Sequence, residues 1–234
     1  MKKHRSNVLD TIHLNQNIEP RSNNQCRYFN SIDKNVFTFG VGHPGTGKTI
    51  ISLWKAVLEI LNPKSRISKI IIIRPCIQNR FGENIGSLPG ELRDKMMPNC
   101  MSIIDNLNYF LNKASTEKLI EHYIEFVPLT LLRGRSLNNA FIIVEEAQNI
   151  KLSGKGVYMI MSRLGVHSKM VFNGDLAQSD LGLEDSALAD AIERLDGMTG
   201  VGIVELYHKD DIQRHPLLHE IMIKFNEINE DLFN

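Results

Sequence analysis

Short, largely apolar runs alternate with stretches of helical periodicity along most of the chain. The runs that we predict to be strands are residues 36–41, 69–74, 124–127, 141–144, 169–172 and 201–206. Strands that are apolar on both faces are typical of a parallel sheet with helices packed on each side. The pattern therefore predicts an α/β fold with a mostly parallel sheet and helices on both faces.

Apolar residues at helical spacing predict helices in three other stretches. Their inward positions are Ile51, Trp54, Leu58 and Leu61 before Asn62 and Pro63; Met101, Ile104, Leu107 and Leu111 within residues 90–123; and Leu217, Ile221, Phe225 and Ile228 after Pro216. Residues 1–20 are polar and show little periodicity, so we expect a loosely ordered N-terminal arm. We expect residues 21–234 to form one domain.

The composition excludes several classes of protein. Hydrophobic residues make up 42% of the 234 positions, which is enough for a substantial core. The 27 basic residues balance the 27 acidic ones, which argues against nucleic-acid binding by bulk charge but allows a local basic groove. Cys26, Cys76 and Cys100 have neither zinc nor redox spacing, so we expect free thiols in the cytoplasm. No apolar run is long enough to span a bilayer, and we expect no membrane partner.

A phosphate-binding loop joins the first predicted strand to the first predicted helix. It is the run Gly42-His43-Pro44-Gly45-Thr46-Gly47-Lys48-Thr49, which fits the pattern of Gly, four residues and Gly-Lys-Thr. Glycines let backbone N–H groups turn toward phosphates, and the N-terminus of the helix favours the same anion. We expect Lys48 to reach the β and γ phosphates of ATP and Thr49 to ligate Mg²⁺. The alternative is a Gly-rich turn without a ligand, which the strand–loop–helix context disfavours.

Two acids follow the strand predicted at residues 141–144. In a P-loop site, one carboxylate at such a strand end lies near the metal and the next lies near the attacking water. We therefore assign Glu145 to the metal and Glu146 to the role of general base. The alternative is a solvated acidic turn, which the phosphate loop upstream makes the weaker interpretation.

A polar turn, residues 173–178, follows the next predicted strand. The amide of Gln178 could hydrogen-bond both a γ-phosphate oxygen and the attacking water, because it donates and accepts. Taken alone, these residues would be an ordinary Gly-Asp turn. As the third motif at a strand end, they make Gln178 a candidate sensor of the γ-phosphate.

The motifs together resemble the PhoH-like proteins, which are relatives of the superfamily-1 helicase core. The stretches that carry this resemblance are residues 42–49, 73–75, 88–90, 133–138, 145–149, 174–178 and 214–216. The resemblance implies a RecA-like P-loop ATPase domain that uses ATP and Mg²⁺. It also implies an association with phosphate starvation, and the compact form favours the bacteriophage type in a bacterial or phage-infected cell.

The resemblance suggests further site residues. Gln25 lies where helicase-like ATPases carry a glutamine that reads the donor and acceptor edge of adenine; the alternative is a surface glutamine in a polar arm. Arg214 is a candidate arginine finger, with a salt bridge to Asp210 or Asp211 as its rival role. Arg163 is a second finger candidate for which a surface charge is the favoured interpretation.

Nucleic-acid contacts are a separate expectation. Arg74, Arg133 and Arg135 lie on loops at strand ends, where helicase-like domains touch the sugar–phosphate chain; ordinary surface arginines are an equal alternative. The chain departs from its relatives at Glu145, where they usually have Asp. The extra methylene would push this carboxylate toward the metal and could reduce activity while nucleotide binding survives.

We therefore expect an ATPase that couples hydrolysis to binding or remodelling of RNA or single-stranded DNA. One such domain is half of a helicase motor, so we expect a homo-oligomer such as a hexameric ring, with a finger arginine supplied by a neighbour. The alternative is an ATP-gated module that binds nucleic acid or protein without helicase activity. A small-molecule kinase is disfavoured, because such enzymes lack an acidic pair followed by residues like 147–149.

Overall fold

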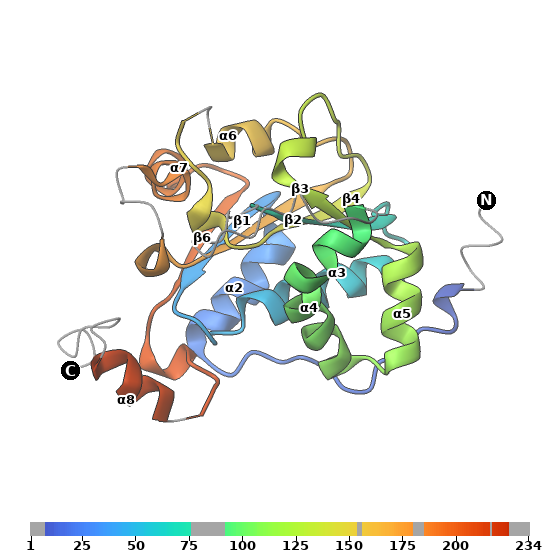
Figure 1. Ribbon diagram of the computed structural model, residues 1–234, viewed down its shortest axis with the longest axis horizontal. Helices are drawn as coiled ribbons and strands as arrows, with labels where there is room; N and C mark the ends of the chain where they lie inside the picture. Colours follow the sequence, from blue (N-terminus) through green and yellow to red (C-terminus); the bar gives the residue numbers. More distant parts are fainter. Residues whose placement is uncertain (1–7, 76–91, 154–155, 180–184, 216, 225–234) are drawn as a thin grey trace.

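Six parallel strands form one sheet in the order β3-β2-β4-β5-β1-β6 (Figure 1). This computed structural model describes residues 8–75, 92–153, 156–179, 185–215 and 217–224. The strands are β1 Phe37–Gly42, β2 Lys69–Arg74, β3 Ile124–Pro128, β4 Ala140–Val144, β5 Lys169–Gly174 and β6 Val201–Leu206. Every pairing between them is parallel. The predicted α/β fold is confirmed, and the observed strands match the predicted ones within two residues at each end.

Helices cover both faces of the sheet, as predicted. One face carries α2 Asn23–Lys34, α3 Lys48–Leu61, α4 Leu92–Phe110 and α5 Lys113–His122, and the other carries α6 Gly156–Met161 and α7 Ala187–Leu195 (Figure 1). Alternate residues of one strand feed the two cores, so Ile70 and Ile72 pack toward α3 while Ile71 and Ile73 pack toward α6 and α7. The sheet is therefore buried on both sides, which explains its unbroken apolar runs.

The buried stripe of α4 differs from the predicted one. Leu107 and Leu111 are buried as predicted, but Cys100 and Ile103 are buried in place of Met101, which is exposed, and Ile104, which is only partly buried. On this buried side, Phe110 makes an edge-to-face contact with Trp54 of α3, with ring centroids 5.3 Å apart. The predicted long helix is also two helices, since Asn112 caps α5 by accepting a hydrogen bond from the N–H of Ser115.

The closing helix, α8 Leu217–Lys224, projects from the body of the domain near the C-terminus (Figure 1). Its predicted inward residues Leu217 and Ile221 are exposed, and Met222 is buried instead, so this part of the prediction is wrong. The last two predicted inward positions, Phe225 and Ile228, and the stretch 88–90 that carried part of the resemblance lie outside the described residues.

Part of the expected N-terminal arm packs on the domain. Ile12 and Ile18 are buried in the core under α3 and α4. Leu14 forms a bridge with Leu111, and the backbone N–H of Asn15 donates to the Phe110 carbonyl at 2.9 Å. Residues 8–20 therefore differ from a loosely ordered segment, because widely spaced apolar residues anchor them to the end of α4.

The helix α2 was not predicted, because its sequence is mostly polar. Ser22 caps its first turn, and its side chain accepts from the N–H of Gln25. Tyr28 is fully buried beside β1, where a Cβ on Gly40 would lie 2.6 Å from the ring. A glycine at position 40 thus lets α2 approach the first strand and brings α2 next to the phosphate loop. The helices α6 and α7 were not predicted either.

Within the described residues, no helix combines the length and the apolar character that crossing a membrane requires.

Candidate active site

The phosphate loop joins β1 to α3 in the conformation that its glycines permit. Gly45 and Gly47 have φ angles of 79° and 81°, in the left-handed region that other residues rarely adopt. A Cβ on Gly47 would lie 3.0 Å from Nε2 of Gln25, and one on Gly45 would lie 2.8 Å from the side chain of Arg214. The N–H of His43 donates to the Leu206 carbonyl at 3.2 Å, which ties the loop to β6.

Lys48 begins α3 and folds back over the loop. Its Nζ donates to the carbonyl oxygens of Gly42 and His43 at 2.6 and 2.8 Å, and it lies 3.1 Å from the hydroxyl of Thr46. Burial lowers the pKa of Lys48 to about 8, although the charges of Asp175 and the two acids of the next motif oppose this shift. The buried ammonium group is thus solvated mainly by two backbone carbonyls, and an anion bound in the loop could replace them as its partner.

Thr49 and Glu145 meet at the mouth of the loop. The Thr49 hydroxyl donates to Oε2 of Glu145 at 3.0 Å, and Nδ2 of Asn173 donates to Oε1 of the same carboxylate at 2.8 Å. Burial raises the pKa of Glu145, and both hydrogen bonds oppose the shift. A hydroxyl and a carboxylate oxygen side by side are the hard ligands that Mg²⁺ prefers. These two residues therefore fit a nucleotide-bound magnesium ion.

Tyr28 and Asn173 support this pair from behind and were not assigned roles from the sequence. The Tyr28 hydroxyl donates to Oδ1 of Asn173 at 2.5 Å, and Nδ2 of Asn173 also donates to Ser52 at 3.0 Å. Both residues are buried, and burial raises the pKa of Tyr28. Asn173 stood in a recognised motif, but Tyr28 lies 145 residues before it, and nothing in the local sequence marks that contact.

Glu146 occupies an unusual backbone conformation beside the first acid. Its φ of 53° and ψ of 41° are left-handed, which in a residue other than glycine costs free energy and is common at functional sites. Arg74 at the end of β2 lies 3.2 Å from Oε1, and Nε2 of Gln148 donates to Oε2 at 2.8 Å. The carboxylate is therefore half-buried and held from two sides, next to the predicted metal position.

Gln148 links the second and third motifs. Besides its bond to Glu146, it accepts the backbone N–H of Asp175 on its Oε1 at 3.1 Å. Its backbone carbonyl accepts the hydroxyl of Ser179 at 3.1 Å. The neighbouring Gln178 has an exposed side chain on the wall of the cavity, so its role as a γ-phosphate sensor stays a prediction.

Gln25 is buried against the phosphate loop, only 3% exposed, so the alternative of a surface glutamine is wrong. Its Nε2 donates to the carbonyl of Thr46 at 3.0 Å and lies 3.5 Å from that of Asp211. Its Oε1 accepts the backbone N–H of Arg21 at 2.7 Å. The carboxamide therefore holds the loop to the segments on either side of it.

Arg214 lies over the phosphate loop. The N–H of the preceding residue, Gln213, donates to the carbonyl of Gly45 at 2.9 Å, which fixes this segment to the loop. The two aspartates that could have formed a salt bridge with Arg214 have other partners. Asp211 accepts hydrogen bonds from Ser22 and from Nδ2 of Asn24. Asp210 lies 3.4 Å from His208. The arginine is exposed, and its charge contributes to the lowered pKa of Lys48.

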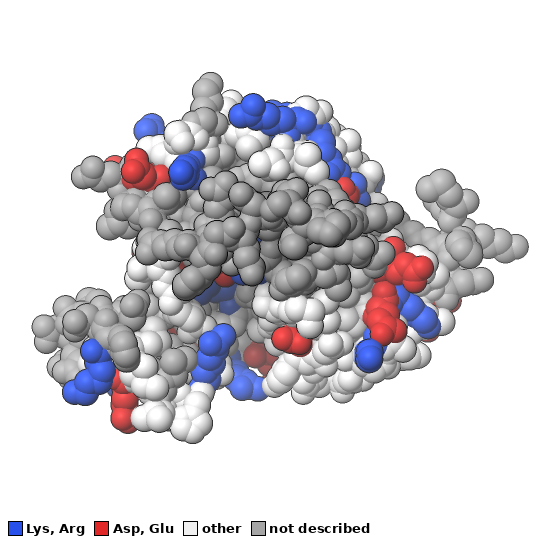
Figure 2. All heavy atoms as spheres, viewed as in Figure 1, with Lys and Arg blue, Asp and Glu red and all other residues white. Residues whose placement is uncertain are grey.

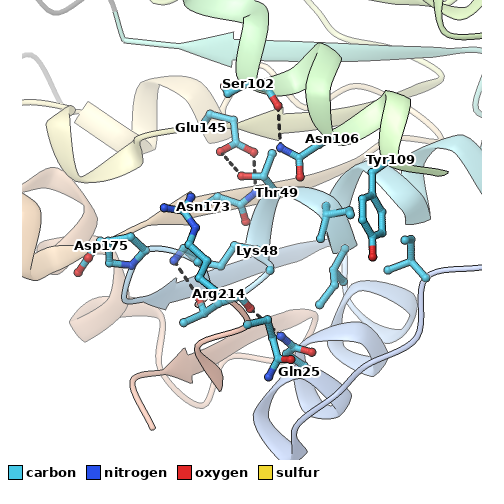
Figure 3. Close-up of a pocket in the computed structure, with 18 of the residues that line it drawn as sticks. Gln25, Lys48, Thr49, Ser102, Asn106, Tyr109, Glu145, Asn173, Asp175 and Arg214 are labelled. Atoms are coloured by element: carbon cyan, nitrogen blue, oxygen red, sulfur yellow. Dashed lines mark hydrogen bonds between the residues drawn. The ribbon is translucent and has the colours of Figure 1, made fainter. Parts of the chain in front are cut away.

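One cavity of about 680 Å³ gathers these residues, within the range of small-molecule sites. Figure 3 shows Lys48, Thr49 and Glu145 together in its middle, with Asp175 on one side and Tyr109 of α4 on the other. Its wall includes all predicted loop positions from Pro44 to Thr49, together with Gln25, Arg74, Glu145, Glu146, Gln178 and Arg214. The polar edge of the sheet is therefore one site.

Three candidate arginines lie elsewhere. Arg135 is paired with Glu125 of β3 at 2.6 Å, Arg133 is exposed, and Arg163 at the end of α6 contacts Ser162 at 3.0 Å. None of the three lines the cavity. Figure 2 shows basic side chains along the upper edge of one face, over the segment that follows β3. The nucleic-acid role of Arg133 and Arg135 stays a prediction.

Several known proteins are similar to this chain in sequence. A sequence model described as PhoH-like protein matches residues 17–226. The chain belongs to the PhoH-like protein family. It is 38% identical over 217 residues to a PhoH-like protein of Bacillus subtilis, and the aligned region covers 92% of this chain and 66% of the relative. It is 33% identical over 201 residues to Protein PhoH of Escherichia coli, and the aligned region covers 84% of this chain and 55% of the relative.

This PhoH-like chain spans 59% of a Mycobacterium tuberculosis relative that is 38% identical over 215 residues. It therefore spans less than two thirds of the relatives that it matches. A Sulfolobus solfataricus SWI2/SNF2 ATPase core in complex with dsDNA covers 85% of the chain at 17% identity, with a TM-score of 0.40. The family model confirms the predicted family, and the parallel sheet with its phosphate loop between β1 and α3 confirms the predicted P-loop fold class.

Proposed function

We propose that this PhoH-like chain binds ATP with Mg²⁺ and hydrolyses it. The observation that supports this proposal is the convergence of Lys48, the Thr49–Glu145 pair and Glu146 on one cavity. A cation, a hydroxyl–carboxylate pair and a second carboxylate are what phosphoryl transfer to water requires. The left-handed conformation of Glu146 adds to the argument, because such strain is common where a side chain must be aimed at a reacting group.

Each residue has a role in this proposal. Lys48 leaves the carbonyls of Gly42 and His43 and binds the β and γ phosphates. Thr49 and Glu145 hold Mg²⁺, which would neutralise charge on the phosphates. Glu146 accepts a proton from the attacking water.

Two further side chains complete the site. Gln178, exposed on the cavity wall, orients the attacking water and contacts the γ-phosphate. Arg214, over the phosphate loop, offsets charge that develops in the transition state. Both groups act only when a triphosphate fills the loop.

We propose that hydrolysis is coupled to RNA or single-stranded DNA through Arg74. Its guanidinium pairs with Glu146 at 3.2 Å, and both side chains are partly exposed. A nucleic-acid phosphate competing for Arg74 would release Glu146 to act on water, because an arginine binds phosphate as readily as carboxylate. Nucleic acid would then raise the rate of hydrolysis.

The same ion pair also favours a second candidate function, an ATP-gated binding module. If Glu146 stays bound to Arg74 and Gln148, nucleotide binding could close the site while hydrolysis remains slow. The two functions differ in turnover rather than in affinity. Nucleotide-dependent RNA binding without strand displacement supports the module, and duplex opening that requires ATP supports the motor.

We also propose a homo-oligomer in which a neighbouring copy completes the site. Arg214 is exposed at the rim of the cavity, where it could serve its own site or a neighbour's. Sedimentation with and without ATP tests this step. Full ATPase turnover by a monomer would contradict it.

The decisive experiment measures phosphate release from ATP and Mg²⁺ alone and with RNA, single-stranded DNA or duplex. We expect turnover that rises with a single-stranded nucleic acid. An Arg74→Ala variant should have a higher basal rate and lose this stimulation. The matched control is Arg194→Ala, which removes an exposed arginine of α7 that is likewise paired with a carboxylate but lies outside the cavity. Absence of both ATP affinity and phosphate release in the presence of Mg²⁺ would overturn the proposed function.

A further inference from the structure

The cavity continues beyond the phosphate loop into a second compartment. We call it the arm compartment and define it by Ile18, Pro20, Arg21 and Tyr109, all of which line the cavity. Figure 3 shows the ring of Tyr109 projecting from α4 on the side of the cavity away from Asp175. If the triphosphate of a nucleotide is bound at Lys48 and Thr49, this compartment is available for the sugar and base of the same nucleotide.

Hydrogen bonds and packing hold the arm compartment together. Nε2 of Gln16 donates to the backbone carbonyl of Tyr109 at 2.7 Å, and the N–H of Asn15 donates to that of Phe110 at 2.9 Å. Ile18 is buried in the core, and a terminal nitrogen of Arg21 lies 3.5 Å from the Tyr109 hydroxyl. A phenol ring and a guanidinium group are therefore brought to one place by two distant segments of the chain.

Gln25, the glutamine to which the family resemblance gives the adenine-reading role, is committed to the protein itself. A glutamine reads adenine by donating to N7 and accepting from the N6 amino group. Both hydrogens of Gln25 Nε2 point at backbone carbonyls, those of Thr46 and Asp211, and its Oε1 accepts from Arg21. The amide has no hydrogen left for N7, since an NH₂ group has only two. This arrangement differs from the adenine-reading role that the family resemblance implies.

We propose that the arm compartment binds the nucleobase by stacking on Tyr109 and Arg21 and does not select adenine. The substrate class is then any nucleoside triphosphate, purine or pyrimidine. This inference rests on the proposed function, because it assumes a triphosphate in the phosphate loop. Stacking tolerates every base, since each has a π-face, whereas strong discrimination requires hydrogen-bonding groups dedicated to the base edge.

Binding of all four nucleotides tests the inference directly. We expect the Kd values of ATP, GTP, CTP and UTP with Mg²⁺ to lie within about tenfold of one another, because the amide of Gln25 is engaged by the protein and the base is held by stacking. An affinity for ATP more than tenfold above that for each of the other three would overturn it. Inorganic triphosphate is measured in parallel, since it fills the phosphate loop without entering the arm compartment.

Tyr109→Ala separates stacking from phosphate binding. We expect it to weaken all four nucleotides by about tenfold, the effect of losing one base–aromatic contact, and to leave the Kd of inorganic triphosphate unchanged. Tyr158→Ala is the matched control, because this exposed tyrosine on α6 does not line the cavity. Unchanged nucleotide affinity in Tyr109→Ala would overturn the stacking role.

Gln25→Ala tests the second half of the inference. As a positioning residue that holds the Thr46 carbonyl, Gln25 should affect inorganic triphosphate and all four nucleotides by the same factor. A loss confined to ATP would show that this amide reads adenine and would overturn the proposal. If the wild-type chain binds neither nucleotides nor inorganic triphosphate, the proposed function fails instead, and the two failures are therefore distinguishable.

Discussion

Asn173 donates a hydrogen bond of 2.8 Å from Nδ2 to Oε1 of Glu145. This bond orients the amide so that its Oδ1 faces Tyr28, whose hydroxyl donates to it at 2.5 Å. The buried phenol and Ser52, which also accepts from Nδ2, help to hold this end of the amide toward the carboxylate. Without the phenol, Oδ1 loses its donor and the orientation of the amide is held less firmly. The carboxylate that fits the metal is thus positioned in part from α2. This helix packs on β1 and β6, and β5 lies between β1 and β4, the strand that Glu145 follows.

We predict that Tyr28→Phe raises the Mg²⁺ concentration needed for half-maximal ATP hydrolysis. Loss of one buried hydrogen bond, worth about 1 kcal/mol, corresponds to roughly a fivefold change. Titration of turnover with Mg²⁺ measures the effect, and nucleotide binding without metal should not change. Tyr158→Phe, at an exposed site on α6, is the control. An unaltered Mg²⁺ dependence in Tyr28→Phe would remove Tyr28 from the positioning role.

We predict that Glu146→Gln keeps ATP bound but stalls hydrolysis. The amide is close in shape to the carboxylate but cannot accept the proton of water, so kcat should fall by about 100-fold or more. Equilibrium binding of ATP should stay close to wild type, because Lys48 and the loop are untouched. Glu121→Gln on the exposed side of α5 tests for a general effect of charge. Wild-type turnover in Glu146→Gln would exclude it as the base.

Local patterns predicted the strands well, because strands buried on both faces appear in the sequence as unbroken apolar runs. Such a run can be identified without knowing which strands pair with it. The strand from Lys69 to Arg74 has its predicted ends, and the phosphate loop follows β1 as expected. The predicted inward face of α8 was wrong, and that of α4 was wrong at Met101 and Ile104, for a physical reason. Each helix has apolar residues one position apart, such as Ile103 beside Ile104, and only tertiary packing decides which is buried.

The candidate site was predictable where a residue belongs to a motif and hidden where it acts through packing. Lys48, Thr49 and Glu145 converge as expected from strand ends that meet at one edge of the sheet. Tyr28 could not be predicted, because its helix is polar and its partner is distant in sequence. The burial of Gln25 depends likewise on α2 docking beside the phosphate loop.

We predict that ATP affinity falls as the pH rises above about 8, the pKa to which burial lowers Lys48. Above this pH the free protein loses the positive charge that a triphosphate requires, so binding must take up a proton. Each pH unit then costs up to about tenfold in affinity. Kd measurements between pH 7.5 and 9.5 test this. Lys48→Arg is the control, because a guanidinium keeps its charge over this range and should show a flat profile.

The same group has a stability consequence of opposite sign. In the unfolded chain Lys48 titrates near its ordinary pKa of 10.5, so between about pH 8 and 10.5 the unfolded state binds more protons. The contribution of Lys48 to the free energy of unfolding therefore rises with pH across this window, while ATP affinity falls. Urea unfolding of wild type and Lys48→Arg at both ends of the window should differ in slope with pH. Identical pH profiles would show that burial does not shift this lysine.

We predict that Ile12→Ala lowers the free energy of unfolding by about 2 kcal/mol, the lower end for a buried isoleucine. Ile12 is 7% exposed and belongs to the core under α3 and α4, whereas Leu14, two residues later, is 36% exposed. Leu14→Ala is therefore the matched control and should change stability by less than about 0.5 kcal/mol. Urea unfolding midpoints measure both. If the segment were loosely attached, the two variants would have equal midpoints, because neither side chain would lose buried contacts.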